Sequence, residues 1–217
     1  MSMILHREIE KLKKQLLSVG AVVEEALSQV VQSLNLRNEI LARQIAASDS
    51  EIDRMEVEVE EECLKILALH QPVAADLRFV VAVLKMNNDL ERMGDLAANI
   101  AKRVVYLATH PPVDLTLDFA GMGAKVQSMV KRSLDALVNY DAALARQVCA
   151  DDDEVDQMRR DFEEKIKEAI QKNPSQSESL MTLSSVTRHL ERLADMATNV
   201  AEDVIYMVEG AIIRHRG

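Results

Sequence analysis

Two short acidic turns stand one hundred residues apart in this chain. Glu91 and Asp95 are four residues apart, and Glu191 and Asp195 repeat that spacing. On a helix such pairs face the same side, and like charges at this spacing destabilise a helix by about 0.2–0.5 kcal/mol. The same costly arrangement stands in both places, which favours a chemical role. Carboxylate oxygens are the ligands that hard divalent cations prefer.

The repeat extends well beyond the acids. Residues 87–107 and 187–207 are identical at nine of twenty-one positions, and a second match relates 51–61 to 154–164 with an offset of 103. Self-similarity of this kind predicts two copies of one structural unit. We place the first unit at residues 1–110 and the second at 113–217.

Apolar residues recur at helical spacing along almost the whole chain, and prolines interrupt the pattern at Pro72, Pro111 and Pro174. Aromatic residues make up only 3% of the chain, which suits aliphatic helix packing better than a sheet sandwich. The prediction is an all-α fold of two tandem three-helix bundles with antiparallel neighbours. The six predicted helices span about 3–34, 39–69, 73–109, 114–138, 141–171 and 176–209.

The acids fall on the polar side of their predicted helices. At 100° per residue, Glu91 and Asp95 share a face with Asn99, away from the apolar stripe. The middle helices carry comparable acidic faces: Asp49, Asp53, Glu56 and Glu60 in the first unit, and Asp152, Asp156 and Glu163 in the second. We expect both faces to border one groove in each unit. The candidate metal ligands are Glu91, Asp95, Asn99, Asp53, Glu191, Asp195, Asn199 and Asp156.

Hard oxygen ligands without histidine favour magnesium, manganese, calcium or iron over a closed zinc site. The competing interpretation is that these faces are simply solvated, as charged helix faces usually are. Arg92 and Arg192 also repeat, and we expect each to pair with an acid of a middle helix.

Composition excludes several classes of function. Thirty-six acidic and 26 basic residues give a net charge of −10, which argues against direct binding of nucleic acid. Cys63 and Cys149 form no CxxC pair, and we expect both to be free thiols in a reducing compartment. The N-terminal residues turn polar at once, and no uncharged apolar run reaches the length of a membrane span. We therefore expect a cytoplasmic protein.

Taken together, these motifs resemble the PhoU family of phosphate-signalling proteins. The two acidic turns match the family's two Glu/Asp-x-x-x-Asp signatures, and residues 71–78 are similar to its first unit. The resemblance covers nearly the whole chain. The two signatures differ at one small residue, since the second has Ala194 where the first has Gly94. It implies two three-helix bundles in tandem and a negative regulator of phosphate uptake and of the phosphate-starvation response.

The resemblance also implies partners and a cofactor. The partners would be the ATPase subunit of a phosphate ABC transporter and a phosphate sensor histidine kinase, so that membrane association is peripheral and runs through them. The cofactor would be a divalent or multinuclear metal (iron, manganese, magnesium or zinc) at Glu91, Asp95, Glu191 and Asp195. Asn99, Asn199, Asp53 and Asp156 are added from helical geometry. Methionine-rich stripes on long helices favour a homodimer.

Two other functions are compatible with the sequence. A metal-dependent hydrolase could use the repeated carboxylates, but it would need a helper group, and only the repeated arginines are at hand. The chain has no Glu-x-x-His motif and no glycine-rich phosphate loop, so we predict a protein without enzymatic activity. A metal-free helical interaction module is the second alternative.

Overall fold

The computed structural model describes residues 3–47 and 49–210, except for the side chain of residue 49. Within these residues, all regular secondary structure is helical. The all-α prediction is therefore confirmed. None of these helices is both long and apolar enough to cross a lipid bilayer. In chain order they are α1 (Met3–Leu36), α2 (Glu39–Ala47), α3 (Asp49–His70), α4 (Ala74–Thr109), α5 (Phe119–Asn139), α6 (Ala142–Lys172), the 3₁₀ turn η1 (Pro174–Gln176) and α7 (Ser177–Glu209).

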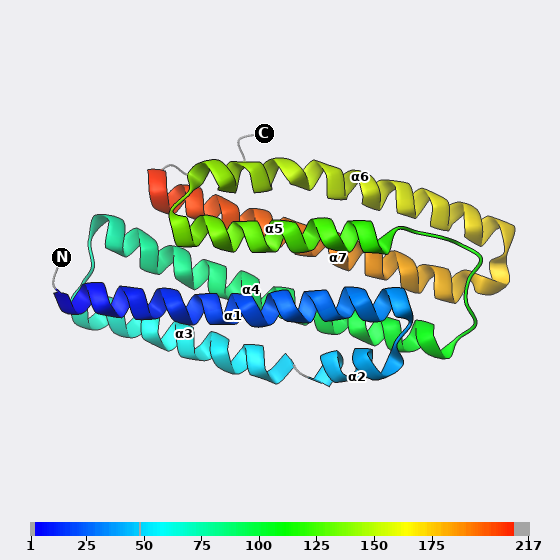
Figure 1. Cartoon of the computed structure of the whole chain (residues 1–217), viewed down its shortest axis with the longest axis horizontal. Helices are drawn as coiled ribbons and strands as arrows, with labels where there is room; N and C mark the ends of the chain where they lie inside the picture. The colour runs from blue at the N-terminus through cyan, green and yellow to red at the C-terminus, as the bar shows by residue number, and fades with distance from the viewer. Residues whose placement is uncertain (1–2, 48, 211–217) are drawn as a thin grey trace.

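The helices form two bundles that lie side by side along their length (Figure 1). Helices α1, α2, α3 and α4 form the first bundle, and α5, α6 and α7 form the second. Packing of α4 against α7 and of α1 against α5 joins the two bundles. The buried side chains of both bundles belong to one continuous hydrophobic core.

Two of the predicted helices differ from the observed ones. The predicted helix 39–69 corresponds to α2 and α3, on either side of residue 48, which lies outside the described residues. The predicted helix 114–138 begins only at Phe119. The reason is a cap: the carboxylate of Asp118 accepts a hydrogen bond of 2.8 Å from the Gly121 amide and satisfies the first turn. The residues before it run over the core through the partly buried Val113 and Leu117.

Glycines set the close approach of α1 to α5. A Cβ atom on Gly20 would lie 2.6 Å from Leu134 Cδ1, and one on Gly123 would lie 2.6 Å from Val31 Cγ1. Both distances are shorter than normal Cβ contacts, so a side chain at either position would require Leu134 or Val31 to shift. The offset of 103 residues that relates the middle helices also relates Gly20 to Gly123 and Val31 to Leu134. The first helices of the two units are therefore equivalent, although their sequences alone do not align.

Apolar packing holds the helices that carry the acidic turns. Leu90, Met93, Leu190 and Leu193 are fully buried. Because these residues alternate with the acids at helical spacing, burying them turns the acids outward.

Removal of the Leu90 side chain tests this anchoring. We expect Leu90→Ala to lower the free energy of unfolding by about 2–5 kcal/mol, since the core closes only partly around such a cavity. The exposed Leu64, 54% accessible, provides the control, and Leu64→Ala should change stability by less than about 0.5 kcal/mol. Urea denaturation followed by circular dichroism measures both, and equal losses would contradict the packing described.

Candidate metal centre

The first acidic cluster consists of Asp53 and Glu56 on α3 and Glu91 and Asp95 on α4. Glu91 is half-buried, and burial is the largest cause that raises the pKa of its carboxyl group. The neighbouring carboxylates raise that pKa further, in the order Asp95, Asp53 and Glu56. Burial likewise raises the pKa of Glu56, with Glu60 and Asp53 adding to it. Acids from two helices thus share one electrostatic field, as the helical spacing predicts.

A buried amide holds α3 and α4 in register at this cluster. Asn87 donates from Nδ2 to the backbone carbonyl of Glu56 at 2.8 Å and to its Oε1 at 3.2 Å. Asn87 is 1% exposed, so these bonds lie in a largely water-free setting, where they count for more. The Glu56 carboxylate is therefore aimed toward α4.

The second acidic cluster consists of Asp152 and Asp156 on α6 and Glu191 and Asp195 on α7. Burial and the surrounding carboxylates raise the pKa of Asp152 to about 6. Burial is the largest cause, followed by the carboxylates of Asp195, Asp156, Glu191 and Asp153. Oδ1 of Asp152 is buried and has no hydrogen-bond partner among the described residues. The sequence places Asp152 on the acidic face but does not single it out, because periodicity says nothing about burial between helices.

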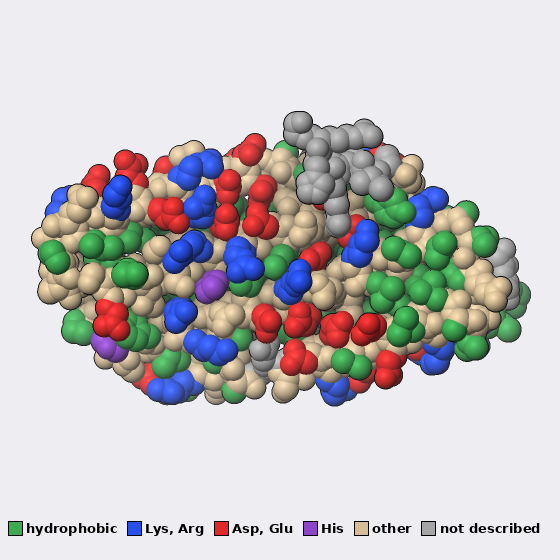
Figure 2. Space-filling model, turned by 180° about the vertical axis from the view of Figure 1, so that it is seen from behind, with side chains coloured by type: hydrophobic (Ala, Val, Ile, Leu, Met, Phe, Trp, Pro, Cys, Tyr) green, Lys and Arg blue, Asp and Glu red, His purple; other side chains and the backbone are tan. Residues whose placement is uncertain are grey.

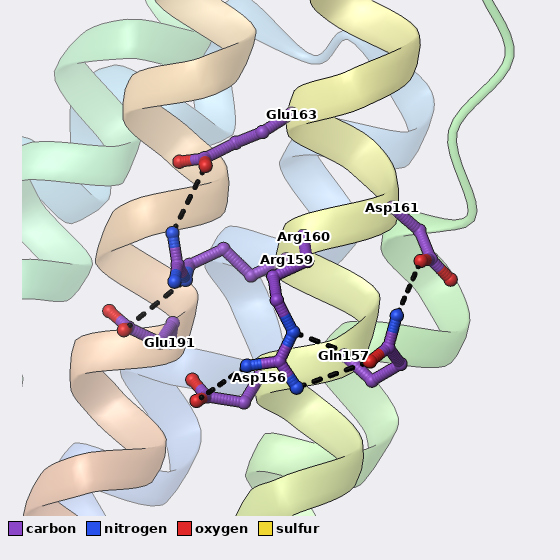
Figure 3. A network of polar contacts seen from close by, with 7 residues as sticks. All are labelled: Asp156, Gln157, Arg159, Arg160, Asp161, Glu163 and Glu191. Carbon is purple, nitrogen blue, oxygen red and sulfur yellow. Dashed lines mark hydrogen bonds and ion pairs between the residues drawn. The ribbon is translucent and has the colours of Figure 1, made fainter.

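Arg159 distinguishes the second cluster from the first. Its Nη1 lies 3.1 Å from Glu163 Oε2 and its Nε lies 3.3 Å from Glu191 Oε1, so one guanidinium bridges α6 and α7 (Figure 3). The next residue, Arg160, reaches Asp156 Oδ2 at 3.2 Å. The offset of 103 residues places Glu56 at the position of Arg159. The second cluster is thus partly neutralised by an arginine of its own middle helix, whereas the first has a glutamate at that position.

The side-chain amides of the two predicted asparagine ligands form no hydrogen bond with the clusters among the described residues. Asn99 and Asn199 are half-buried, and neither amide makes a hydrogen bond within residues 3–47 and 49–210. Of the four acids predicted on the face of the first middle helix, Asp49 lies outside the described side chains. The six carboxylates Asp53, Glu91, Asp95, Asp156, Glu191 and Asp195 do fall into the two clusters.

The predicted pairing of Arg92 and Arg192 with middle-helix acids is wrong. In the described part of the chain neither arginine forms an ion pair. In the second unit the ion pair runs the opposite way from the prediction. The middle helix supplies the cation, Arg159, and α7 supplies the acid, Glu191. The charge of Arg192 acts instead on His189, whose pKa it helps to lower.

The chemistry of these residues fits a hard cation. Each cluster offers several carboxylate oxygens and no thiolate, and a buried Asp152 oxygen without a partner is a position that a cation would satisfy. Among the described residues, no three His, Cys, Asp or Glu side chains stand in an arrangement ready to hold a metal ion. Binding in the second cluster would therefore require side-chain rotation and release of Glu191 by Arg159.

Comparison with known proteins links both bundles to one family. The PhoU domain model matches residues 16–104 and 119–204. A phosphate-specific transport system accessory protein PhoU homolog from Aquifex aeolicus is 38% identical over 214 residues, which covers 99% of this chain and 97% of that protein. The homolog from Pseudomonas aeruginosa is 35% identical and is matched over 97% of this chain and 87% of its own.

Solved structures show the same architecture. The crystal structure of PhoU from Pseudomonas aeruginosa superimposes with a TM-score of 0.92 at 34% identity, covering 95% of this chain and 99% of that one. The phosphate transport system regulatory protein PhoU from Streptococcus pneumoniae superimposes with a TM-score of 0.85 at 28% identity, covering 96% and 99%.

The raised pKa of Asp152 predicts a pH dependence of stability in metal-free protein. The folded state holds this proton up to about pH 6, whereas the unfolded chain releases it near 3.8. The folded state therefore binds more protons in that window, and stability falls as the pH rises through it. Asp152→Asn should remove this loss and stabilise the protein at pH 7 by about 1 kcal/mol, a figure reduced for solvent screening of a partly exposed group.

Urea denaturation at pH 4 and pH 7 in the presence of a chelator measures the effect. Glu164→Gln, an exposed acid on the same helix, serves as the control and should follow the wild type. If the unfolding free energies of Asp152→Asn and wild type change equally between the two pH values, ionised Asp152 does not destabilise the fold.

Proposed function

The chain belongs to the PhoU family, and from this premise we propose that it is a non-enzymatic accessory protein that restrains phosphate uptake. The observation that carries the proposal is the pair of PhoU domain matches. Each match contains one complete acidic cluster, Asp53 to Asp95 in the first and Asp152 to Asp195 in the second. Curated relatives that match nearly the whole chain are named accessory proteins of the phosphate-specific transport system.

In this proposal the protein works in the cytoplasm as a negative regulator when phosphate is plentiful. It bridges the ATPase subunit of a phosphate ABC transporter and a sensor histidine kinase, reaching the membrane only through them, and it acts as a homodimer. Long rigid helices support this role, since they present extended faces to a partner without a substrate cavity having to close.

We assign metal binding to the two acidic clusters. The residues that would hold the cation are Asp53, Glu91 and Asp95 in the first cluster and Asp156, Glu191 and Asp195 in the second, with Asn99 and Asn199 nearby. A bound cation supplies positive charge and open coordination positions. With it in place, these carboxylates would no longer repel one another or an acidic partner.

Neutral isosteres test the first metal cluster. We expect Glu91→Gln with Asp95→Asn to lower the bound metal measured by elemental analysis after equilibration with iron, manganese, magnesium or zinc, because two carboxylate donors of the cluster are lost. Helical content should persist, since both side chains lie off the core. Asp114→Asn with Asp135→Asn, which removes the same charge from exposed positions elsewhere, should keep the wild-type stoichiometry. Equal metal content in all three proteins would refute the site.

Partner capture tests the regulatory role. Affinity-tagged protein isolated from its native host at high phosphate should carry the transporter ATPase subunit and the sensor kinase, identified by mass spectrometry, and should carry less of them at low phosphate. The purified protein should release no phosphate from generic phosphatase substrates with magnesium, manganese or iron. Capture of neither partner at either phosphate level would reject the bridging role, and metal-dependent turnover would favour the hydrolase alternative.

A further inference from the structure

The seam between α4 and α7 carries opposite charges in its two halves. The offset of 100 residues relates Asp89 to His189 and Arg103 to Asp203. Helices α4 and α7 run antiparallel, so these four positions form two equivalent sites along the seam. One site contains Asp89 and Asp203, and its counterpart contains Arg103 and His189.

The acidic half is compensated inside the protein. Asp203 is 1% exposed, and Lys85 of α4 places its Nζ 3.4 Å from Asp203 Oδ1. The same ammonium group lies 5.3 Å from the centre of the Tyr206 ring. A buried acid at this position thus has a cation supplied from the facing helix.

The other half, which we call the cationic seam, consists of Arg103, Arg188 and Arg192 around His189. All three arginines are exposed, and none of them forms a hydrogen bond or an ion pair within the part of the chain that the structure describes. His189 is half-buried, and Ser185 Oγ lies 3.4 Å from its Nε2. Burial lowers the pKa of His189 most, and the charges of Arg103, Arg192 and Arg188 lower it further, so that cations from both helices face one imidazole.

The surroundings make this group unusual. The chain has a net charge of −10, and the acidic turns lie on the same pair of helices. Arg192 alone of the three acts on a nearby acid, lowering the pKa of Asp195. Figure 2 shows basic side chains gathered around a histidine on the face that it draws, with groups of acids beyond them. Guanidinium groups that form no ion pair within the described residues are suited to paired hydrogen bonds with carboxylates from outside.

We propose that the cationic seam docks an acidic segment of the partner protein, bringing its Asp and Glu side chains onto Arg103, Arg188 and Arg192. This inference rests on the proposed function and names the surface and the partner chemistry that it uses. Three guanidiniums spread over two helices and open to solvent suit several carboxylates on one segment better than a single small anion. The acidic clusters beyond the seam repel a longer acidic surface, which limits the segment's length and sets its position.

Charge reversal at the seam tests the proposal. The variant Arg103→Glu with Arg188→Glu is compared with wild type for binding to the purified transporter ATPase subunit and to the cytoplasmic part of the sensor kinase. Like charges facing each other should weaken binding at least about tenfold and flatten its salt dependence. Lys14→Glu with Lys131→Glu, exposed positions on α1 and α5, makes the same change in net charge and should bind like wild type.

The outcomes distinguish a wrong docking surface from a wrong proposed function. Circular dichroism checks folding, and Arg103→Gln with Arg188→Gln, which only removes charge, should give an intermediate loss of affinity. If wild type binds a partner and the reversed variant binds it equally well, the docking surface is wrong while the proposed function stands. If wild type binds neither partner, the proposed function fails and the docking surface fails with it. Competition by inorganic phosphate beyond that of sulfate at equal ionic strength would overturn the protein segment in favour of a small anion.

Discussion

Packing between α4 and α7 is the constraint on which the rest of this molecule depends. Each of these helices buries one apolar side, through residues such as Leu90 and Leu190, and keeps its acidic turn on another. Their contact joins the two bundles, and both acidic turns and the cationic seam lie on this pair of helices. Because the helices are anchored along more than thirty residues each, their polar faces are held in place by the core and not by their own interactions.

The acidic clusters illustrate how a core can hold groups that repel one another. Burial and mutual repulsion raise the pKa values of Glu91, Glu191 and Asp195, which means that the ionised clusters oppose folding to some extent. The two units relieve this differently. The second unit has Arg159 bridging Glu163 and Glu191, whereas the first has Glu56 at the equivalent position and the charge of Arg92 lowering the pKa of Glu91. Duplication has therefore kept the framework while the local charge has changed.

The same contrast appears along the α4–α7 seam. One half buries Asp203 against Lys85, and the equivalent half presents Arg103 beside His189. A repeated fold does not require a repeated surface, because helix packing depends on the apolar stripe and leaves exposed positions free to diverge. The acidic turns and the cationic seam lie on the same two helices, so these helices carry an uneven charge pattern that can orient a charged partner.

The amino-acid sequence by itself determined the all-α class, the duplication, most helix limits and the outward placement of the acidic turns. These properties depend on local periodicity, on prolines and on the comparison of one segment with another. Only the tertiary structure decided the equivalence of α1 and α5 through Gly20 and Gly123, the late start of α5 at Phe119, and the bridge from Arg159 to Glu191. Each of these rests on which side chains meet across different helices, and that depends on how the helices pack rather than on spacing within any one of them.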